Sequence, residues 1–126
     1  MSRYEKGANF ERELVNGFYE HGWTAMRAAG SGSVMAPDVI GMKNGRIVII
    51  ECKATKQDRL SLKDAILNMK KISDISGARA YIAVKFYKEK PRFFDVEKLL
   101  LKDNFTISLN DTYLSFDALV GRQRIL

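Results

Sequence analysis

Two acidic residues and one lysine in the first half of the chain have the types and the spacing of a catalytic site. Asp38 comes directly before one run of β-branched residues, and Glu51, thirteen residues further on, follows a second run and precedes Lys53. The pair Asn44-Gly45 stands between the runs, and Asn-Gly in that position is the strongest short-range signal of a β-hairpin. A two-residue turn there sets the register of the strands and predicts that Asp38 lies opposite Glu51.

This register would bring two carboxylates together. Directly opposed residues of an antiparallel pair have Cβ atoms roughly 4.5–5.5 Å apart, and like charges at that separation are destabilising. Lys53 is expected to point to the same face as Glu51, and Cys52 to the other face, because side chains alternate along a strand. Since Mg²⁺ prefers oxygen ligands, Asp38, Glu51 and the backbone carbonyl between Glu51 and Lys53, that of Cys52, are the predicted ligands of a divalent cation.

A less specific interpretation is a solvated hairpin with three surface charges, or a plain ion pair between one carboxylate and Lys53. The run Ile47-Val48-Ile49-Ile50 argues against it, because four successive apolar residues indicate a strand that is buried on both faces. Charged residues at the end of a buried strand are more often functional than decorative. We therefore expect a functional site at the end of this strand.

The composition predicts one domain over residues 1–126, large enough for a single core. No apolar run approaches the roughly 18 residues of a membrane span, and the N-terminus has no hydrophobic signal region, so neither membrane insertion nor secretion is predicted. We expect the protein to be cytoplasmic. One Cys and one His exclude an internal disulfide and are too few for a zinc cluster.

The charge balance favours an acidic partner. The chain carries 21 basic and 15 acidic residues, a net charge of +6, although many basic proteins bind nothing acidic. Two basic clusters suit the neutralisation of nucleic-acid phosphates. The first contains Lys53, Lys56 and Arg59, and the second contains Lys85, Lys88, Lys90 and Arg92.

The order of elements predicts how these residues are positioned. A helix is predicted over residues 3–20, because apolar side chains recur at every fourth position and Gly22 follows as a stop. A strand over residues 23–29 and a flexible loop over residues 30–33 then lead to the hairpin.

The second half of the chain alternates helical and strand patterns. Ser61 is expected to cap a helix that Gly77 ends. Strands are predicted over residues 80–84, 92–96 and 105–109, and a helical turn over residues 115–120. The whole order predicts an α/β fold in which helices flank a mixed central β-sheet.

The sequence resembles a known nuclease family. Asp38 and the tripeptide Glu51-Cys52-Lys53 match the PD-(D/E)xK motif, and the order of elements matches the restriction-endonuclease-like core of that superfamily. Further matches narrow the resemblance to the archaeal-type Holliday junction resolvases, over residues 1 to about 95. These matches lie in the segments 6–14, 27–31, 37–40, 50–55 and 83–86.

The resemblance implies roles for residues of the N-terminal region. Glu11 would be a third catalytic and metal-binding carboxylate, Arg12 and Arg27 would contact DNA phosphates, and Ser31 would be a catalytic and DNA-binding serine. From the sequence alone, Glu11 would instead be a solvent-facing acid that pairs with Arg12 or another neighbour. Ser31 would be a polar loop residue, and the sequence alone would not favour it over Ser33 as the functional serine.

The resemblance also implies the reaction. It predicts a single nuclease domain that resolves four-way DNA junctions by Mg²⁺-dependent phosphodiester hydrolysis, with Mn²⁺ as a substitute, in an archaeal cell or one infected by an archaeal virus. Lys53 would orient or deprotonate the attacking water, while Lys56 and Arg59 would bind DNA. Because a four-way junction has two-fold symmetry, paired nicks call for a homodimer.

Three alternatives remain open from the sequence. A related PD-(D/E)xK nuclease of repair or restriction type would share every catalytic residue. A non-catalytic DNA-binding protein would explain the charge but would leave the opposed acids without a purpose. A sliding-clamp interaction through the tail Gln123-Arg124-Ile125-Leu126 has less support, because this fragment lacks the usual aromatic residues.

Overall fold

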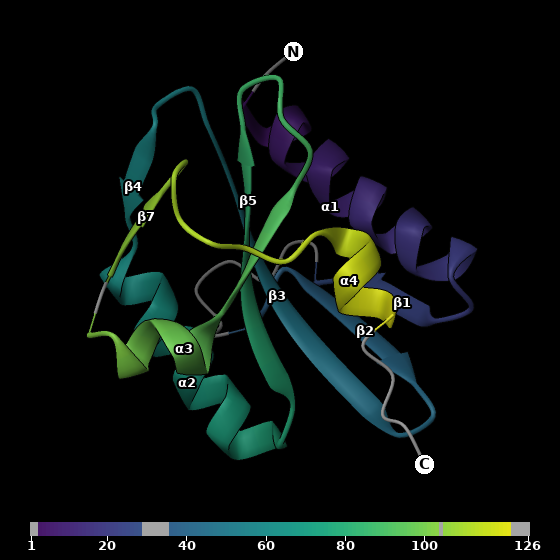
Figure 1. Ribbon diagram of the computed structural model, residues 1–126. Helices are drawn as coiled ribbons and strands as arrows, with labels where there is room; N and C mark the ends of the chain where they lie inside the picture. Colours follow the sequence, from purple (N-terminus) through teal and green to yellow (C-terminus); the bar gives the residue numbers. More distant parts are fainter. Residues whose placement is uncertain (1–2, 29–35, 104, 122–126) are drawn as a thin grey trace.

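The protein forms a five-stranded mixed β-sheet with helices on both faces (Figure 1). The computed structural model describes residues 3–28, 36–103 and 105–121. Within the sheet the order is β1-β2-β3-β5-β6, in which β3 and β5 are parallel and the other neighbours are antiparallel. The elements are α1 (Arg3–Glu20), β1 (Thr24–Arg27), β2 (Val39–Lys43), β3 (Arg46–Thr55), β4 (Arg59–Ser61), α2 (Lys63–Ser76), β5 (Arg79–Phe86), β6 (Arg92–Asp95), α3 (Val96–Leu101), β7 (Thr106–Ser108) and α4 (Phe116–Gly121). The predicted α/β class with a mixed sheet between helices is therefore confirmed.

Helices α1 and α4 cover one face of the sheet (Figure 1). The predicted bounds of α1 are confirmed, and Gly22, with φ +81°, follows its end. Phe10, Leu14 and Phe18 of α1 are buried against this face, because a spacing of four residues keeps them on one side of the helix. The packing of α1 on the sheet also brings Glu11 beside Arg27 of β1.

The opposite face is covered by α2, α3 and the small β4–β7 sheet. Gly77 ends α2 in the left-handed conformation, as the sequence predicts. The predicted cap at Ser61 is wrong: Leu62 precedes the first helical residue without a side-chain cap, and Ser61 ends β4. Ser61 instead lies beside Thr106 of β7, with 3.3 Å between the hydroxyl oxygens.

The predicted hairpin has the expected register. Lys43 pairs with Arg46 and Ile40 pairs with Ile49, and both turn residues, Asn44 and Gly45, have positive φ. This conformation matches the twist of the flanking strands and favours Asn-Gly. One detail of the strand is wrong, since Ile47 is 40% exposed rather than buried.

Strand β3 is longer than its hairpin partner. Pairing with β2 ends at Val39 opposite Ile50, whereas pairing with β5 continues to Thr55 opposite Phe86. Among the strands that the structure describes, the last part of β3 is thus paired on one side only. This overhang contains Glu51, Cys52 and Lys53.

Two short elements were not predicted as such. Strand β4 and helix α3, which contains Leu99-Leu100-Leu101, lie in segments for which the sequence predicts neither a strand nor a helix of these bounds. Both elements cover the α2 side of the sheet, where Leu99 is buried. None of the helices within the described ranges is long and apolar enough to cross a membrane.

The buried carboxylate of Asp95 joins β6 to α3. One oxygen accepts a hydrogen bond from the Glu97 backbone N–H (2.9 Å), and the other accepts from the Arg79 guanidinium (2.6 Å). We expect Asp95→Ala to lower the free energy of unfolding by about 2 kcal/mol, because the helix loses its cap and Arg79 loses its partner. Asp95→Asn keeps an acceptor for the cap and should lose roughly half as much. Urea denaturation measures both values, and an equal loss in the two variants would contradict a capping contribution.

Candidate active site

Asp38, which lies just before β2, contacts the β3 overhang. The Cys52 backbone N–H donates to Asp38 Oδ2 (2.8 Å), and the Asp38 backbone N–H donates to the Ile50 carbonyl (2.9 Å). The strand ladder ends one residue earlier than predicted, so the expected direct pairing of Asp38 with Glu51 is wrong. The Asp38 side chain instead satisfies a backbone donor that β2 no longer pairs.

The carboxylates of Asp38 and Glu51 nevertheless act directly on each other. The pKa of Glu51 is raised to about 7, first by burial and then by the negative charge of Asp38, while Lys53 opposes this shift. The Lys53 ammonium lies 3.6 Å from Glu51 Oε2. The same-face placement of Glu51 and Lys53 is therefore confirmed, and the pair is more than a plain surface ion pair because a second carboxylate adjoins it.

Glu11 of α1 lies near this pair but is held by a cation of its own. Arg27, the last residue of β1, donates from Nε to Glu11 Oε1 (3.1 Å), and both side chains are less than 20% exposed. Burial is the main cause that raises the pKa of Glu11, followed by the charge of Asp38, and Arg27 opposes both. The alternative of a solvent-facing acid paired with Arg12 is wrong, because the exposed Arg12 side chain donates to Asn9.

Asp38 and Glu51 form a pair of carboxylates, and Glu11 lies near them. No three His, Cys, Asp or Glu side chains within the described ranges gather closely enough to hold a metal ion. Glu11 is bonded to Arg27, and its expected part as a third ligand beside Asp38 and Glu51 stays a prediction. Two carboxylates still fit Mg²⁺, because protein sites for this ion commonly supply one or two and leave the remainder to water and substrate phosphate.

The Cys52 backbone faces Asp38. In a strand, the N–H and C=O of one residue point to the same edge. Because the Cys52 N–H points to Asp38, its carbonyl faces the same edge of β3, where the sequence predicts a metal ligand. Burial is the main cause that raises the pKa of the Cys52 thiol, with the Asp38 charge adding to it, so the thiol stays protonated.

The other residues predicted to contact DNA are Lys56, Arg59 and Ser31. Lys56 is exposed and lines a groove of about 910 Å³ beside the overhang, whereas Arg59 is exposed on β4. Ser31 and its alternative Ser33 lie outside the residues that the structure describes, as does the tail 123–126. The groove also contains Tyr87, whose ring is exposed. The sequence does not predict Tyr87 as a binding residue, because a single tyrosine in a basic cluster matches no motif.

Comparisons with known proteins agree on one family. A family model described as archaeal Holliday junction resolvase matches residues 2–125. The crossover junction endodeoxyribonuclease Hjc of Sulfolobus acidocaldarius is 32% identical, and the match covers 95% of this chain and 90% of that protein. Its counterpart in Methanocaldococcus jannaschii is 35% identical over 69% of this chain, and the match spans 64% of that protein's length, less than two thirds of it.

A solved structure supports the same likeness. The Holliday junction resolvase Hjc of Archaeoglobus fulgidus superimposes with a TM-score of 0.78 at 29% sequence identity, covering 91% of this chain and all of that chain. The expected restriction-endonuclease-like fold is confirmed by this likeness. The matching family and the carboxylate pair at the β3 overhang lead to the same class of chemistry.

Proposed function

The chain belongs to the archaeal Holliday junction resolvase family, and we propose that it is a structure-selective endonuclease that cuts four-way DNA junctions by metal-dependent hydrolysis. The observation that carries the proposal is the pair of Asp38 and Glu51 at the overhang of β3. The neighbouring Asp38 charge raises the pKa of the partly buried Glu51, and a bound cation would favour the ionised form of Glu51. Phosphodiester hydrolysis is a reaction that a cation in this position assists.

Asp38, Glu51 and the Cys52 carbonyl would hold Mg²⁺, with Mn²⁺ as a substitute. When bound, the ion would lower the pKa of a coordinated water and would stabilise the charge that develops on the phosphate. Lys53, 3.6 Å from Glu51, would orient or deprotonate the attacking water and neutralise the phosphate. The donor set fits this group of ions because it consists of hard oxygen atoms.

The neighbouring residues would position the substrate. Glu11 would act beside the carboxylate pair, and Arg27, which already holds Glu11, would offer its guanidinium to a DNA phosphate. Arg12, Lys56 and Arg59 are exposed and would neutralise other phosphates, and Ser31 is proposed as a further catalytic contact. Two copies related by a two-fold axis would then nick two strands of one junction, so we propose a homodimer with one site per copy.

The direct test compares DNA substrates. We expect the purified protein to nick a labelled four-way junction symmetrically in Mg²⁺, to leave a linear duplex of the same sequence uncut, and to cut nothing in EDTA. Gel electrophoresis of end-labelled strands reads out each product. Equal cleavage of junction, duplex and flap would contradict junction selectivity while keeping a nuclease, and binding without cleavage in Mg²⁺ would contradict both.

A further inference from the structure

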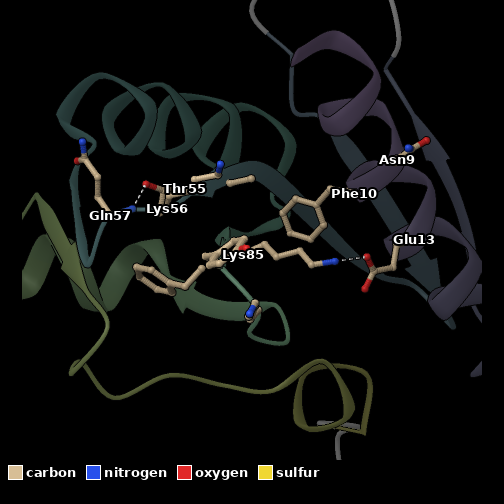
Figure 2. Close-up of a pocket in the computed structure, with 11 residues that line it drawn as sticks. Asn9, Phe10, Glu13, Thr55, Lys56, Gln57 and Lys85 are labelled. Carbon is tan, nitrogen blue, oxygen red and sulfur yellow. Dashed lines mark hydrogen bonds and ion pairs between the residues drawn. The ribbon is translucent and has the colours of Figure 1, made fainter. Parts of the chain in front are cut away.

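A groove opens beside the site, at the ends of β3 and β5. One wall is formed by α1 residues that flank Glu11, among them Phe10 and Glu13, and the other is formed by the connection that follows β3 (Figure 2). Lys85 of β5 extends between the walls and bonds to Glu13 (2.8 Å). The groove therefore begins next to the overhang and uses none of the carboxylates proposed for cleavage.

The groove is basic and carries one exposed aromatic ring. Three lysines and one glutamate are among its lining residues, a balance of +2. Tyr87 is 61% exposed, and the ammonium groups of Lys56 and Lys88 lie 5.7 and 5.4 Å from the centre of its ring. Cations at this distance keep phosphate-binding groups next to a flat apolar surface.

The turn after β5 displays this ring. The Glu89 backbone N–H donates to the Phe86 carbonyl (2.9 Å), which closes a tight turn with Tyr87 and Lys88 at its tip. Lys88 has φ +62°, a conformation that Gly or Asn adopts at lower energetic cost. The turn thus places Tyr87 beside Lys88, whose backbone is strained, on the lining of the groove.

The ion pair of Glu13 with Lys85 marks where an anion would bind. Both side chains are partly exposed, so the pair contributes little to stability and can be exchanged for another anion. A phosphate at Lys85 would replace the Glu13 carboxylate without leaving the ammonium unpaired. A neighbouring nucleotide base would then lie within reach of the Tyr87 ring.

We propose that this groove binds one DNA strand of the branched substrate, with phosphates on Lys85, Lys56 and Lys88 and an unstacked base next to the branch point on the ring of Tyr87. Proteins that bind single strands combine a basic groove with aromatic rings in this way. A continuous duplex keeps its bases stacked and offers Tyr87 none, so Tyr87 distinguishes branched from linear DNA. The proposal rests on the proposed function, whose substrate contact it specifies.

The test measures binding in EDTA to a four-way junction that carries 2-aminopurine at the branch point, and to a linear duplex of the same sequence. We expect Tyr87→Ala to weaken junction binding by about tenfold and duplex binding much less, with reduced quenching of 2-aminopurine, whereas Tyr87→Phe retains both signals. Tyr19→Ala, which removes an exposed tyrosine of α1 outside the groove, is the matched control and should bind as the unaltered protein does.

Glu13→Gln tests the exchangeable ion pair. Releasing Lys85 should tighten binding to both DNAs by about threefold at low salt. Glu20→Gln, on the same helix and exposed, changes net charge by the same amount and should have a smaller effect. Equal tightening in the two glutamine variants would overturn the assignment of a phosphate to Lys85.

Three outcomes separate this proposal from the proposed function. Unchanged junction binding by Tyr87→Ala, or equal loss on junction and duplex with an unchanged melting temperature, overturns the stacking role even if the unaltered protein cleaves junctions in Mg²⁺. Selective loss of junction binding in a protein that cleaves no junction overturns the nuclease and supports the groove. Selective loss together with cleavage supports both.

Discussion

Replacing Glu51 with Gln is expected to slow junction cleavage by about 100- to 1000-fold, the usual effect of losing one group that stabilises transition-state charge. Binding of the uncut junction should remain, because Glu51 is not among the residues that line the groove. Single-turnover cleavage in Mg²⁺ and binding in EDTA measure the two quantities separately. Loss of both in a folded variant would contradict a role confined to the chemical step.

The same substitution should stabilise the folded chain in the absence of divalent metal. The pKa of Glu51 rises from 4.5 to about 7 on folding, so between these values the folded state holds a proton that the unfolded state has released. Stability then falls as pH increases through this window. Glu51→Gln lacks this loss and should be more stable than the unaltered protein by about 3 kcal/mol above pH 7, with little difference below pH 4.5.

Melting temperatures from pH 4 to pH 8 in EDTA measure this difference. Mg²⁺ at pH 8 should raise the melting temperature of the unaltered protein and leave Glu51→Gln nearly unchanged, because the proposed ion site needs both carboxylates. Glu20→Gln serves as the control, since this exposed acid of α1 belongs to neither site. A difference that is constant across pH would contradict the raised pKa as its cause.

The largest effects on stability are expected where Phe18 of α1 lies on Gly41 of β2. Phe18 is fully buried between Trp23 and Phe116, with ring centres 5.2 and 5.1 Å away. A Cβ at position 41 would lie 2.8 Å from two carbons of the Phe18 ring, so a side chain there must displace the ring. We expect Phe18→Ala to cost about 3–5 kcal/mol and Gly41→Ala about 1–3 kcal/mol.

The two substitutions should not be additive. Once Phe18→Ala has removed the ring, Gly41→Ala meets open space and should cost almost nothing. Urea denaturation of both single variants and the double variant gives the coupling energy. Gly7→Ala is the control, because a Cβ there meets no atom within 4 Å, and it should raise stability by about 0.5–1 kcal/mol. Additive losses would contradict direct contact between ring and glycine.

Short-range sequence patterns predict much of the fold and part of the candidate site. The Asn44-Gly45 turn fixes the register of β2 and β3, so the neighbourhood of Asp38 and Glu51 followed from sequence alone. The spacing of apolar residues likewise gave the full length of α1. The turn depends on contacts between residues that are close in sequence, and the helix depends on a regular spacing of apolar residues. Both patterns can be read from the sequence without knowledge of the fold.

The remaining features depend on contacts between distant segments. The early end of β2 turns the side chain of Asp38 to the Cys52 N–H, and the packing of α1 on the sheet joins Glu11 to Arg27. Neither contact has a spacing that a sequence pattern could show. The sequence predicts a helix cap at Ser61 because serine is a preferred capping residue, whereas its place in a strand depends on Thr106 of β7, 45 residues away.

The unequal lengths of β2 and β3 have a consequence for aggregation. A strand segment with one unpaired edge is a template to which a foreign strand can add its backbone, and natural sheets protect such edges with charge. The overhang of β3 has its Cys52 N–H occupied by a carboxylate and charged side chains at Glu51 and Lys53. The residues proposed to cut DNA thus also discourage another chain from joining the sheet, and variants that neutralise them should lose part of that protection along with the proposed activity.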